Sequence, residues 1–526
     1  MRLSFSSSLL ASLGTGAFAA TVSQTLTIGN AVLSPDGYAR DGVTVNGQFP
    51  GPLVSANVGD DFEITVVDAL HDDDLAQVTT VHWHGFSQMG TAEMDGVDTV
   101  TQCPITPGNQ FTYKFPVKDQ AGTYWYHSHY KTQYCDGLRG PLVIYDPNDP
   151  QKSLYDVDDE STVWTLSDWY HFPSPQAPII VFFNSTLING KGRYIDAFGE
   201  NLTNELAVVN VVAGTRYRIR LVSMSCDPNF IFSIDNHQMT IIEVEGTNVQ
   251  PLVVDQIQIL AAQRYSFVLN ANQPVDNYWI RAFPESASPN TLAQTFDHGL
   301  NQAILRYKGA LATDPTTTNS STLPLVETDL HPLTPLPVPG KHTAGGADKT
   351  LTLNIEFNDT TGFYVNNVQY MGPSVPVLLQ ILSGNKTAQQ LMPAGSIYGL
   401  DPNTTVDLVI PGGSRGGPHP MHLHGHHFWV IRSANNATYN FDNPIYRDTV
   451  NIGNSSTDEV TVRFVTDNPG PWFFHCHIDW HLNTGLGVVM AESVSEVAAA
   501  NPNIPSSWDA LCPAYNDYVA SHPNSL

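Results

Sequence analysis

Short segments in which apolar and polar residues alternate recur along the whole chain. Examples are TVSQTLTIGNAVL (21–33), FEITVVDAL (62–70), LAVVNVVAG (206–214) and EVTVRFVTD (459–467). They are rich in β-branched residues and end at Gly, Pro, Asn or Asp, which predicts short β-strands. One stretch, EVAAANPNIPSSWDALC (496–512), favours helix, although prolines interrupt it. The pattern therefore predicts an all-β protein built from sandwiches or barrels.

Changes in composition divide the chain into segments. At roughly 150 residues per domain, a chain of 526 residues predicts about three domains. Turn residues cluster over 145–153, and residues 312–349 are rich in Thr and Pro, which indicates an extended linker. We therefore expect domains over 21–150, 151–311 and 350–526, with the linker at 312–349.

The first 20 residues have the features of a secretory signal peptide. Arg2 precedes a run of apolar and small residues that ends in Ala17-Phe18-Ala19. No later stretch is apolar for long enough to cross a membrane, so we expect a secreted, extracellular protein without a membrane anchor. Eight N-x-S/T triplets are candidate glycosylation sites. They begin at Asn184, Asn201, Asn319, Asn358, Asn385, Asn403, Asn436 and Asn454.

The chain is strongly acidic. It contains 23 Lys and Arg against 50 Asp and Glu, a formal net charge of −27. This excess of negative charge argues against nucleic acid or an anionic membrane surface as a partner. We therefore expect neither nucleic acid nor a membrane as a partner, and separately we expect a monomer.

Histidines are concentrated in four His-x-His pairs, two in each terminal third of the chain. On a strand, residues i and i+2 face the same side, so each pair projects two imidazoles from one surface. A lone pair of this kind is more often structural, but four of them favour metal binding, and eight imidazoles would hold more than one ion. Neutral imidazole suits zinc, copper, iron and nickel. The pairs are His82/His84, His127/His129, His422/His424 and His475/His477.

Cys476 stands between the two histidines of the last pair. If His475 and His477 face one side of a strand, Cys476 faces the other and can bind a different metal ion. His481, in the following turn, and His419 are its expected partners. A site of two histidines and one cysteine is the blue-copper arrangement, which transfers one electron at a time. The shared backbone would give electrons a short covalent path between the two sites.

The other four cysteines are Cys103, Cys135, Cys226 and Cys512. In an exported protein they should form two disulfides, for which three pairings are possible.

Several motifs together resemble the basidiomycete laccases of the multicopper oxidase family. They include NGQFPGP (46–52), TQCPITPG (101–108), LINGKGR (187–193) and NPGPWFFHCHIDWH (468–481). The resemblance implies three consecutive cupredoxin-like Greek-key domains of the β-sandwich or barrel type. It also implies a secreted laccase that oxidises phenols and related aromatics in one-electron steps and reduces O₂ to water. Four copper ions would be needed, one in the third domain and three between the first and third.

The resemblance assigns each ligand and each disulfide. The type 1 ion would be held by His419, Cys476 and His481, with Leu486 at the axial position as a non-ligand. The disulfides would be Cys103–Cys512 and Cys135–Cys226. The type 2 ion would be held by His82 and His422, and the type 3 pair by His84, His127, His129, His424, His475 and His477.

The same resemblance implies roles for further residues. Asp95 and Asp479 would relay protons near the three-copper cluster, although Asp95 before a glycine is also a typical turn residue. Asp227 would accept the proton of a phenol, Asn229 would line the same pocket, and His481 would take the substrate's electron. His426 and His427 are outside the ligand pattern, and we expect His427 at the surface or at a pocket rim.

Three alternatives remain at this stage. Another multicopper oxidase, either an ascorbate oxidase or a ferroxidase, would share the ligands. An inactive copper-storing or cell-wall protein would have lost some of them, whereas all ten histidines and the cysteine are present. A zinc protein would leave Cys476, placed between ligands of another site, without explanation.

Overall fold

The computed structural model describes residues 20–194, 204–285, 301–384 and 387–522. The predicted signal peptide (1–20) therefore lies outside the described residues except for Ala20. In the described ranges the chain is mostly strand, with short helices, and the all-β prediction is confirmed.

The N-terminal third forms two open sheets. Alternation along β4 (Asp61–Ala69) buries Phe62, Ile64 and Val66 and leaves the intervening residues more exposed, as expected for a strand with one face on the core. The first sheet has the order β2 (Arg40–Val45), β1 (Thr21–Leu33), β4 and β6 (Gln110–Pro116). The second sheet has the order β3 (Val54–Asn57), β8 (Arg139–Tyr145), β7 (Gly122–His127) and β5 (His82–His84).

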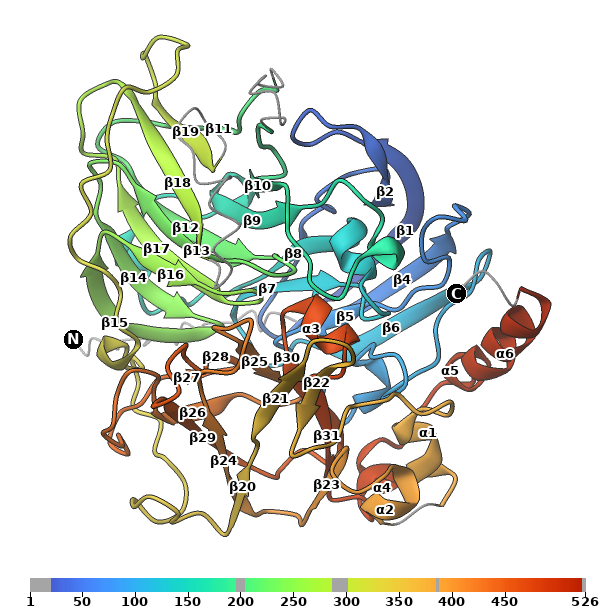
Figure 1. Ribbon diagram of the computed structural model, residues 1–526. Helices are drawn as coiled ribbons and strands as arrows, with labels where there is room; N and C mark the ends of the chain where they lie inside the picture. Colours follow the sequence, from blue (N-terminus) through green and yellow to red (C-terminus); the bar gives the residue numbers. More distant parts are fainter. Residues whose placement is uncertain (1–19, 195–203, 286–300, 385–386, 523–526) are drawn as a thin grey trace, which may run out of the picture.

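The middle third forms two larger open sheets, drawn green to yellow in Figure 1. One has the order β10 (Ser185–Ile188), β9 (Val163–Trp169), β12 (Arg216–Ser223), β17 (Arg264–Asn270), β14 (Met239–Val244) and β15 (Thr247–Val254). The other has the order β11 (Val208–Val211), β19 (Gln302–Tyr307), β18 (Asn277–Glu285), β13 (Asn229–Ile234) and β16 (Ile257–Ile259).

The C-terminal part repeats the arrangement and adds a hairpin. One sheet has the order β20 (Lys349–Thr352), β24 (Thr405–Pro411), β29 (Glu459–Val465), β26 (Phe428–Arg432) and β27 (Tyr446–Arg447). The other has the order β23 (Ile397–Leu400), β31 (Gly487–Glu492), β30 (Gly470–Cys476), β25 (Pro420–Leu423) and β28 (Thr449–Asn451). The hairpin is β21 (Ile355–Asn358) with β22 (Gly362–Val365).

The linker expected over 312–349 lies against the middle sheets. The Leu325 amide donates to the carbonyl of Gln256 (2.7 Å), and the Gln250 amide donates to that of His331 (2.9 Å). The segment is thus hydrogen-bonded to the strand edges that it passes, and it contains one 3-10 turn, Glu327–Asp329.

The helices depart from the prediction for residues 496–512. Only the single turns α4 (Val497–Ala500) and α5 (Ser506–Asp509) form there, because prolines separate them. The longer helix α6 (Leu511–Ser521) begins where the predicted one ends. The remaining described α-helices are α1 (Val377–Leu382), α2 (Ala388–Leu391) and α3 (Asp479–Asn483), and short 3-10 turns occur elsewhere.

Both disulfides implied by the resemblance are present. Cys103 is bonded to Cys512, at the start of α6, over a sequence separation of 409 residues. Cys135 is bonded to Cys226 and connects the N-terminal sheets to the middle ones. Among the cysteines Cys476 is free, and it is buried.

Candidate metal centres

Two strand pairs bring the histidines together at the centre of the molecule, where β5 and β7 lie beside β25 and β30 (Figure 1). His82 faces His127 across the β5–β7 pair, and His422 faces His475 across the β25–β30 pair. The ring centroids of His84 and His422, from opposite ends of the sequence, are 3.9 Å apart. All four His-x-His pairs therefore meet in one buried group, here called the eight-histidine cluster.

The hydrogen bonds of this cluster leave ring nitrogens directed inward. The Nδ1 atoms of His82, His127 and His422 lie 2.7, 2.8 and 2.9 Å from backbone carbonyls, so these nitrogens carry the proton. Their Nε2 atoms then have free lone pairs, and in the described part of the chain these buried atoms have no hydrogen-bond partner. Such fixed tautomers are typical of metal-binding histidines, and this donor set fits a group of metal ions.

Burial and mutual repulsion favour the neutral form of most imidazoles in the cluster. Burial first, and the neighbouring imidazoles second, lower the pKa well below its ordinary value for His127, His129, His422, His424 and His477. Neutral imidazole is the form that binds metal, so the cluster is prepared for ligation without losing protons.

A second group lies on the other face of β30. The Cys476 Sγ is 3.5 Å from the Nδ1 of His419 and 3.8 Å from that of His481, and the two nitrogens are 3.1 Å apart. His419 stands just before β25, and His481 lies on α3. Burial raises the pKa of the Cys476 thiol, so forming a thiolate there requires a cation close by. Two imidazoles and one thiol fit a single thiophilic metal ion.

Leu486 lies next to this group, as the resemblance implies. Its side chain is fully buried, and its carbonyl accepts a hydrogen bond of 3.1 Å from the Cys476 amide. A leucine side chain has no donor atom and cannot bind a metal ion.

One edge of His481 faces a cavity of about 220 Å³. Asp227, Asn229, Phe363 and Trp480 are among its walls. Gly416 lies beside this ring with a φ of +87°: a Cβ at this position would lie 3.0 Å from His481, so the loop favours a glycine there. Burial, with a smaller contribution from Asp168, raises the pKa of Asp227 to about 7.

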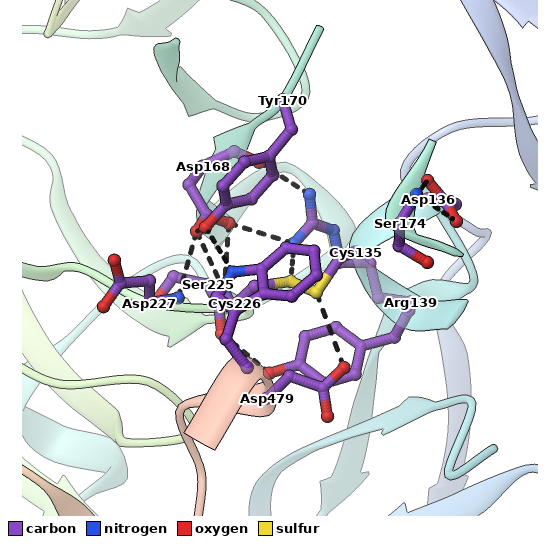
Figure 2. Close-up of a disulfide and its surroundings, with 12 residues drawn as sticks. Cys135, Asp136, Arg139, Asp168, Tyr170, Ser174, Ser225, Cys226, Asp227 and Asp479 are labelled. Atoms are coloured by element: carbon purple, nitrogen blue, oxygen red, sulfur yellow. Dashed lines mark hydrogen bonds and ion pairs between the residues drawn. A yellow bond between two sulfur atoms is a disulfide. The ribbon is translucent and has the colours of Figure 1, made fainter. Parts of the chain in front are cut away.

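Asp168, beside the Cys135–Cys226 disulfide, bonds to several residues next to this cavity (Figure 2). Its carboxylate accepts hydrogen bonds from the amides of Cys226 (2.9 Å) and Asp227 (3.0 Å) and from the hydroxyl of Tyr170 (2.6 Å). The Tyr170 hydroxyl in turn accepts from the indole of Trp480 at 2.9 Å. The disulfide at Cys226, the Asp227 backbone and the Trp480 ring are therefore fixed by one buried carboxylate.

Three family models match the chain, each described as multicopper oxidase, over residues 27–149, 160–310 and 370–496. The chain belongs to the multicopper oxidase family. It is 55% identical over 498 residues to Laccase-2 of Trametes villosa and 55% identical over 495 residues to a laccase of Pycnoporus cinnabarinus, in both cases covering 93% of each chain. The resemblance to basidiomycete laccases is thereby confirmed.

Solved structures of multicopper oxidases are also similar to this chain. A laccase from Botrytis aclada has a TM-score of 0.81 at 31% identity, covering 97% of this multicopper oxidase and 94% of that chain. Fet3p, described as a multicopper oxidase that functions in iron import, also has a TM-score of 0.81, at 28% identity and with 94% and 95% covered. The cupredoxin fold class expected from the sequence is confirmed, with open sheets within the described residues.

The two carboxylates expected near the cluster of this multicopper oxidase have different surroundings. Asp95 contacts the cluster directly: its Oδ2 is 3.0 Å from the Nδ1 of His424, and its carbonyl accepts from His82. The Asp479 carboxyl instead lies 3.5 Å from the Sγ of Cys135 (Figure 2). Burial and nearby Asp168 raise its pKa well above the ordinary value. A protonated Asp479 can donate to this sulfur, whereas a disulfide sulfur has no proton to give.

Sequence reasoning missed Asp448 and Arg264. Both Asp448 oxygens pair with Arg264 (2.8 and 2.6 Å), Oδ1 is 3.2 Å from the Nε2 of His84, and the carbonyl accepts from His422. Burial raises the pKa of Asp448, but Arg264 outweighs this effect and holds it well below its usual range. Arg264 lies on β17, so the middle sheets support a cluster to which they give no histidine.

The placement of His427 corrects one expectation. It is not at a pocket rim: its Nε2 bonds to the carbonyl of Glu245 (2.9 Å) and lies 3.5 Å from the Oδ2 of Asp448. His427 belongs to the contact between the middle and C-terminal sheets. His426 likewise bonds to buried Glu492 (2.7 Å).

Proposed function

We propose that this protein is a laccase, which oxidises phenols and related aromatics one electron at a time and reduces O₂ to water. The main observation in support is the position of Cys476 on β30. It contacts His419 and His481 and is flanked by two histidines of the buried cluster. Relatives that are named laccases at 54–55% identity support the proposal.

We assign one copper ion to His419, Cys476 and His481, and three to the eight-histidine cluster. Within the cluster, His82 and His422 would hold the type 2 ion. The type 3 pair would be held by His84, His127, His129, His424, His475 and His477. When bound, copper supplies one-electron redox chemistry at the first site and the capacity for four-electron reduction of O₂ at the second.

The chain's own residues handle substrate and protons. His481 presents a ring edge to the cavity, which gives a bound aromatic a direct contact for electron loss. Asp227 lies in the same cavity, and its raised pKa makes its carboxylate a stronger proton acceptor for the phenol hydroxyl. Asn229 would help to orient the hydroxyl. At the cluster, we propose that Asp95 and Asp479 deliver protons for water formation.

Replacing Asp227 with Asn should slow the oxidation of substrates that lose a proton more than the oxidation of substrates that lose only an electron. A phenol must lose a proton with its electron, so we expect kcat/KM for dimethoxyphenol to fall at least roughly tenfold. Ferrocyanide, which loses only an electron, should change far less. Asp227→Glu keeps the carboxylate and should retain most of the phenol activity. Equal losses on both substrates in the Asn variant would assign Asp227 a structural role instead.

Replacing Leu486 with Met should lower the potential of the type 1 site. A thioether donates to Cu(II) and stabilises it, whereas leucine cannot. Each 59 mV changes a one-electron equilibrium tenfold, so a modest fall should slow phenols that are hard to oxidise more than easy ones. A redox titration of both proteins tests this. An unchanged or raised potential would place the Leu486 side chain away from the copper axis.

We also propose that the protein is secreted after removal of residues 1–20 and that it is a monomer. The proposed domains span residues 21–150, 151–311 and 350–526, with the linker between the last two. Among the described residues no helix is long and apolar enough to cross a membrane. Of the sequons, Asn319, Asn358, Asn403 and Asn454 are exposed, and Asn201 and Asn385 lie outside the described residues.

The decisive experiment combines metal analysis with two substrates. We expect four copper ions per chain, an intense blue absorption, and O₂ consumption with dimethoxyphenol that exceeds that with Fe(II). A preference for Fe(II) would instead support a ferroxidase, the activity class suggested by the similarity to Fet3p. A preference for ascorbate would indicate an ascorbate oxidase.

A further inference from the structure

Arg415 gives the substrate cavity a positive charge. Among the described residues that line the cavity, it alone is an arginine or lysine. It lies in the loop between β24 and His419, directly before Gly416, where an added Cβ would lie 3.0 Å from the His481 ring. The same loop thus carries the cation and passes beside the electron-accepting histidine.

A row of aromatic rings connects this cation to His481. The ring centroid of Phe363 is 4.4 Å from that of His481, and the centroid of Phe357 is 4.7 Å from that of Phe363. The guanidinium carbon of Arg415 lies 5.3 Å from the Phe357 centroid, in a cation–π contact. Both phenylalanines line the cavity. A phenol ring that carries a short side chain can extend along these rings from His481 toward Arg415.

Charged side chains of both signs line the cavity. Asp227 accepts protons, whereas Arg415 carries several N–H donors that match a carboxylate. The cavity also contains the exposed Glu285, whose carboxylate accepts from the Gln258 amide at 2.8 Å. A ligand anion would be repelled near Asp227 and Glu285 and attracted at Arg415, which fixes one orientation.

The internal partner of Arg415 does not remove this attraction. Arg415 pairs with Asp359, but the two side chains are 59% and 68% exposed. Ion pairs this exposed are worth little, so a substrate carboxylate can share or replace Asp359.

We propose that the cavity selects phenols that carry a carboxylate on a short side chain para to the hydroxyl, such as hydroxycinnamates. The hydroxyl lies at His481 and Asp227, and the carboxylate lies at Arg415. This inference rests on the proposed laccase function and deepens it by naming the substrate class.

Sinapic acid and its methyl ester test the proposal, because they differ in charge and share the phenol. At a pH well above the pKa of the acid's carboxyl, the acid-to-ester ratio of kcat/KM should fall about two- to fivefold in Arg415→Gln. Arg415→Lys keeps the charge and should retain most of the ratio. Added salt should lower the ratio of the wild type and hardly that of the Gln variant.

Two further variants serve as controls. Asp359→Ala removes the competing anion and should raise the ratio; alanine is preferable to asparagine, which would create a new sequon with Thr361. Arg216→Gln removes an arginine of a similarly exposed pair, with Asp156, and should leave the ratio unchanged.

The outcomes separate the two proposals. An acid-to-ester ratio that is the same in the wild type, Arg415→Gln and Asp359→Ala would overturn the role of Arg415 while leaving the laccase proposal intact. Equal losses on acid and ester in Arg415→Gln would also overturn it, because they indicate a change in cavity shape alone. Failure of the wild type to oxidise either compound would overturn the laccase proposal itself.

Discussion

Cys476→Ser should abolish phenol oxidation and remove the intense blue absorption, with three copper ions retained per chain. A serine hydroxyl is a poor ligand for copper at neutral pH, whereas a thiolate is a strong one. Cys476 is fully buried and of nearly the same size as serine, so the sheet at β30 should be preserved. His475 and His477 keep their backbone positions, which is why the eight-histidine cluster should still load.

Copper analysis, the visible spectrum and steady-state rates check this expectation together. Loss of all copper would mean that the variant had misfolded, and the retained three ions are the internal control. A serine variant that stays blue and active would show that Cys476 does not hold the type 1 ion.

Asp448→Asn should destabilise the fold and weaken the copper cluster at the same time. The substitution removes the negative charge opposite Arg264, whose side chain is 0% exposed. An unpaired buried charge costs about 3–5 kcal/mol. Because the Asp448 carboxylate also lies 3.2 Å from the Nε2 of His84 and 3.6 Å from the Nδ1 of His422, we expect roughly 10- to 100-fold weaker copper binding.

Denaturant unfolding and copper titration measure the two effects separately. Asp156→Asn is the matched control, since it breaks the exposed pair with Arg216 and should leave stability and copper content nearly unchanged. Wild-type stability and full copper binding in Asp448→Asn would show that Arg264 finds another partner and that Asp448 does not orient the histidines.

The parts of this site that are local in sequence were predictable. A period of two places His475 and His477 on one side of the chain and Cys476 on the other, and the structure has this arrangement at the end of β30, which His477 directly follows. The disulfide pairings, in contrast, could not be derived from spacing and came from the resemblance to laccases.

Long-range pairs were not predictable because no local pattern encodes them. Arg264 and Asp448 are 184 residues apart, and Glu245 and Arg447, paired at 2.5 Å, are 202 apart. Each is an ordinary charged residue in its own strand or turn, and its role exists only after the sheets have packed. His427 was misplaced for the same reason, because its environment is set by Glu245 and Asp448 from two other segments.

The bond between Cys103 and Cys512 turns most of the polypeptide into a closed covalent ring, with a tail of 102 residues before it and a tail of 14 residues after it. A single break of the backbone anywhere between these residues opens the ring but leaves one connected molecule. The N-terminal and C-terminal sheets, which each contribute four histidines to the cluster, therefore stay tethered even after a cut in the linker between them. Local concentration then favours their reassociation over separation, so the cluster is protected against a proteolytic nick by the connectivity of the chain.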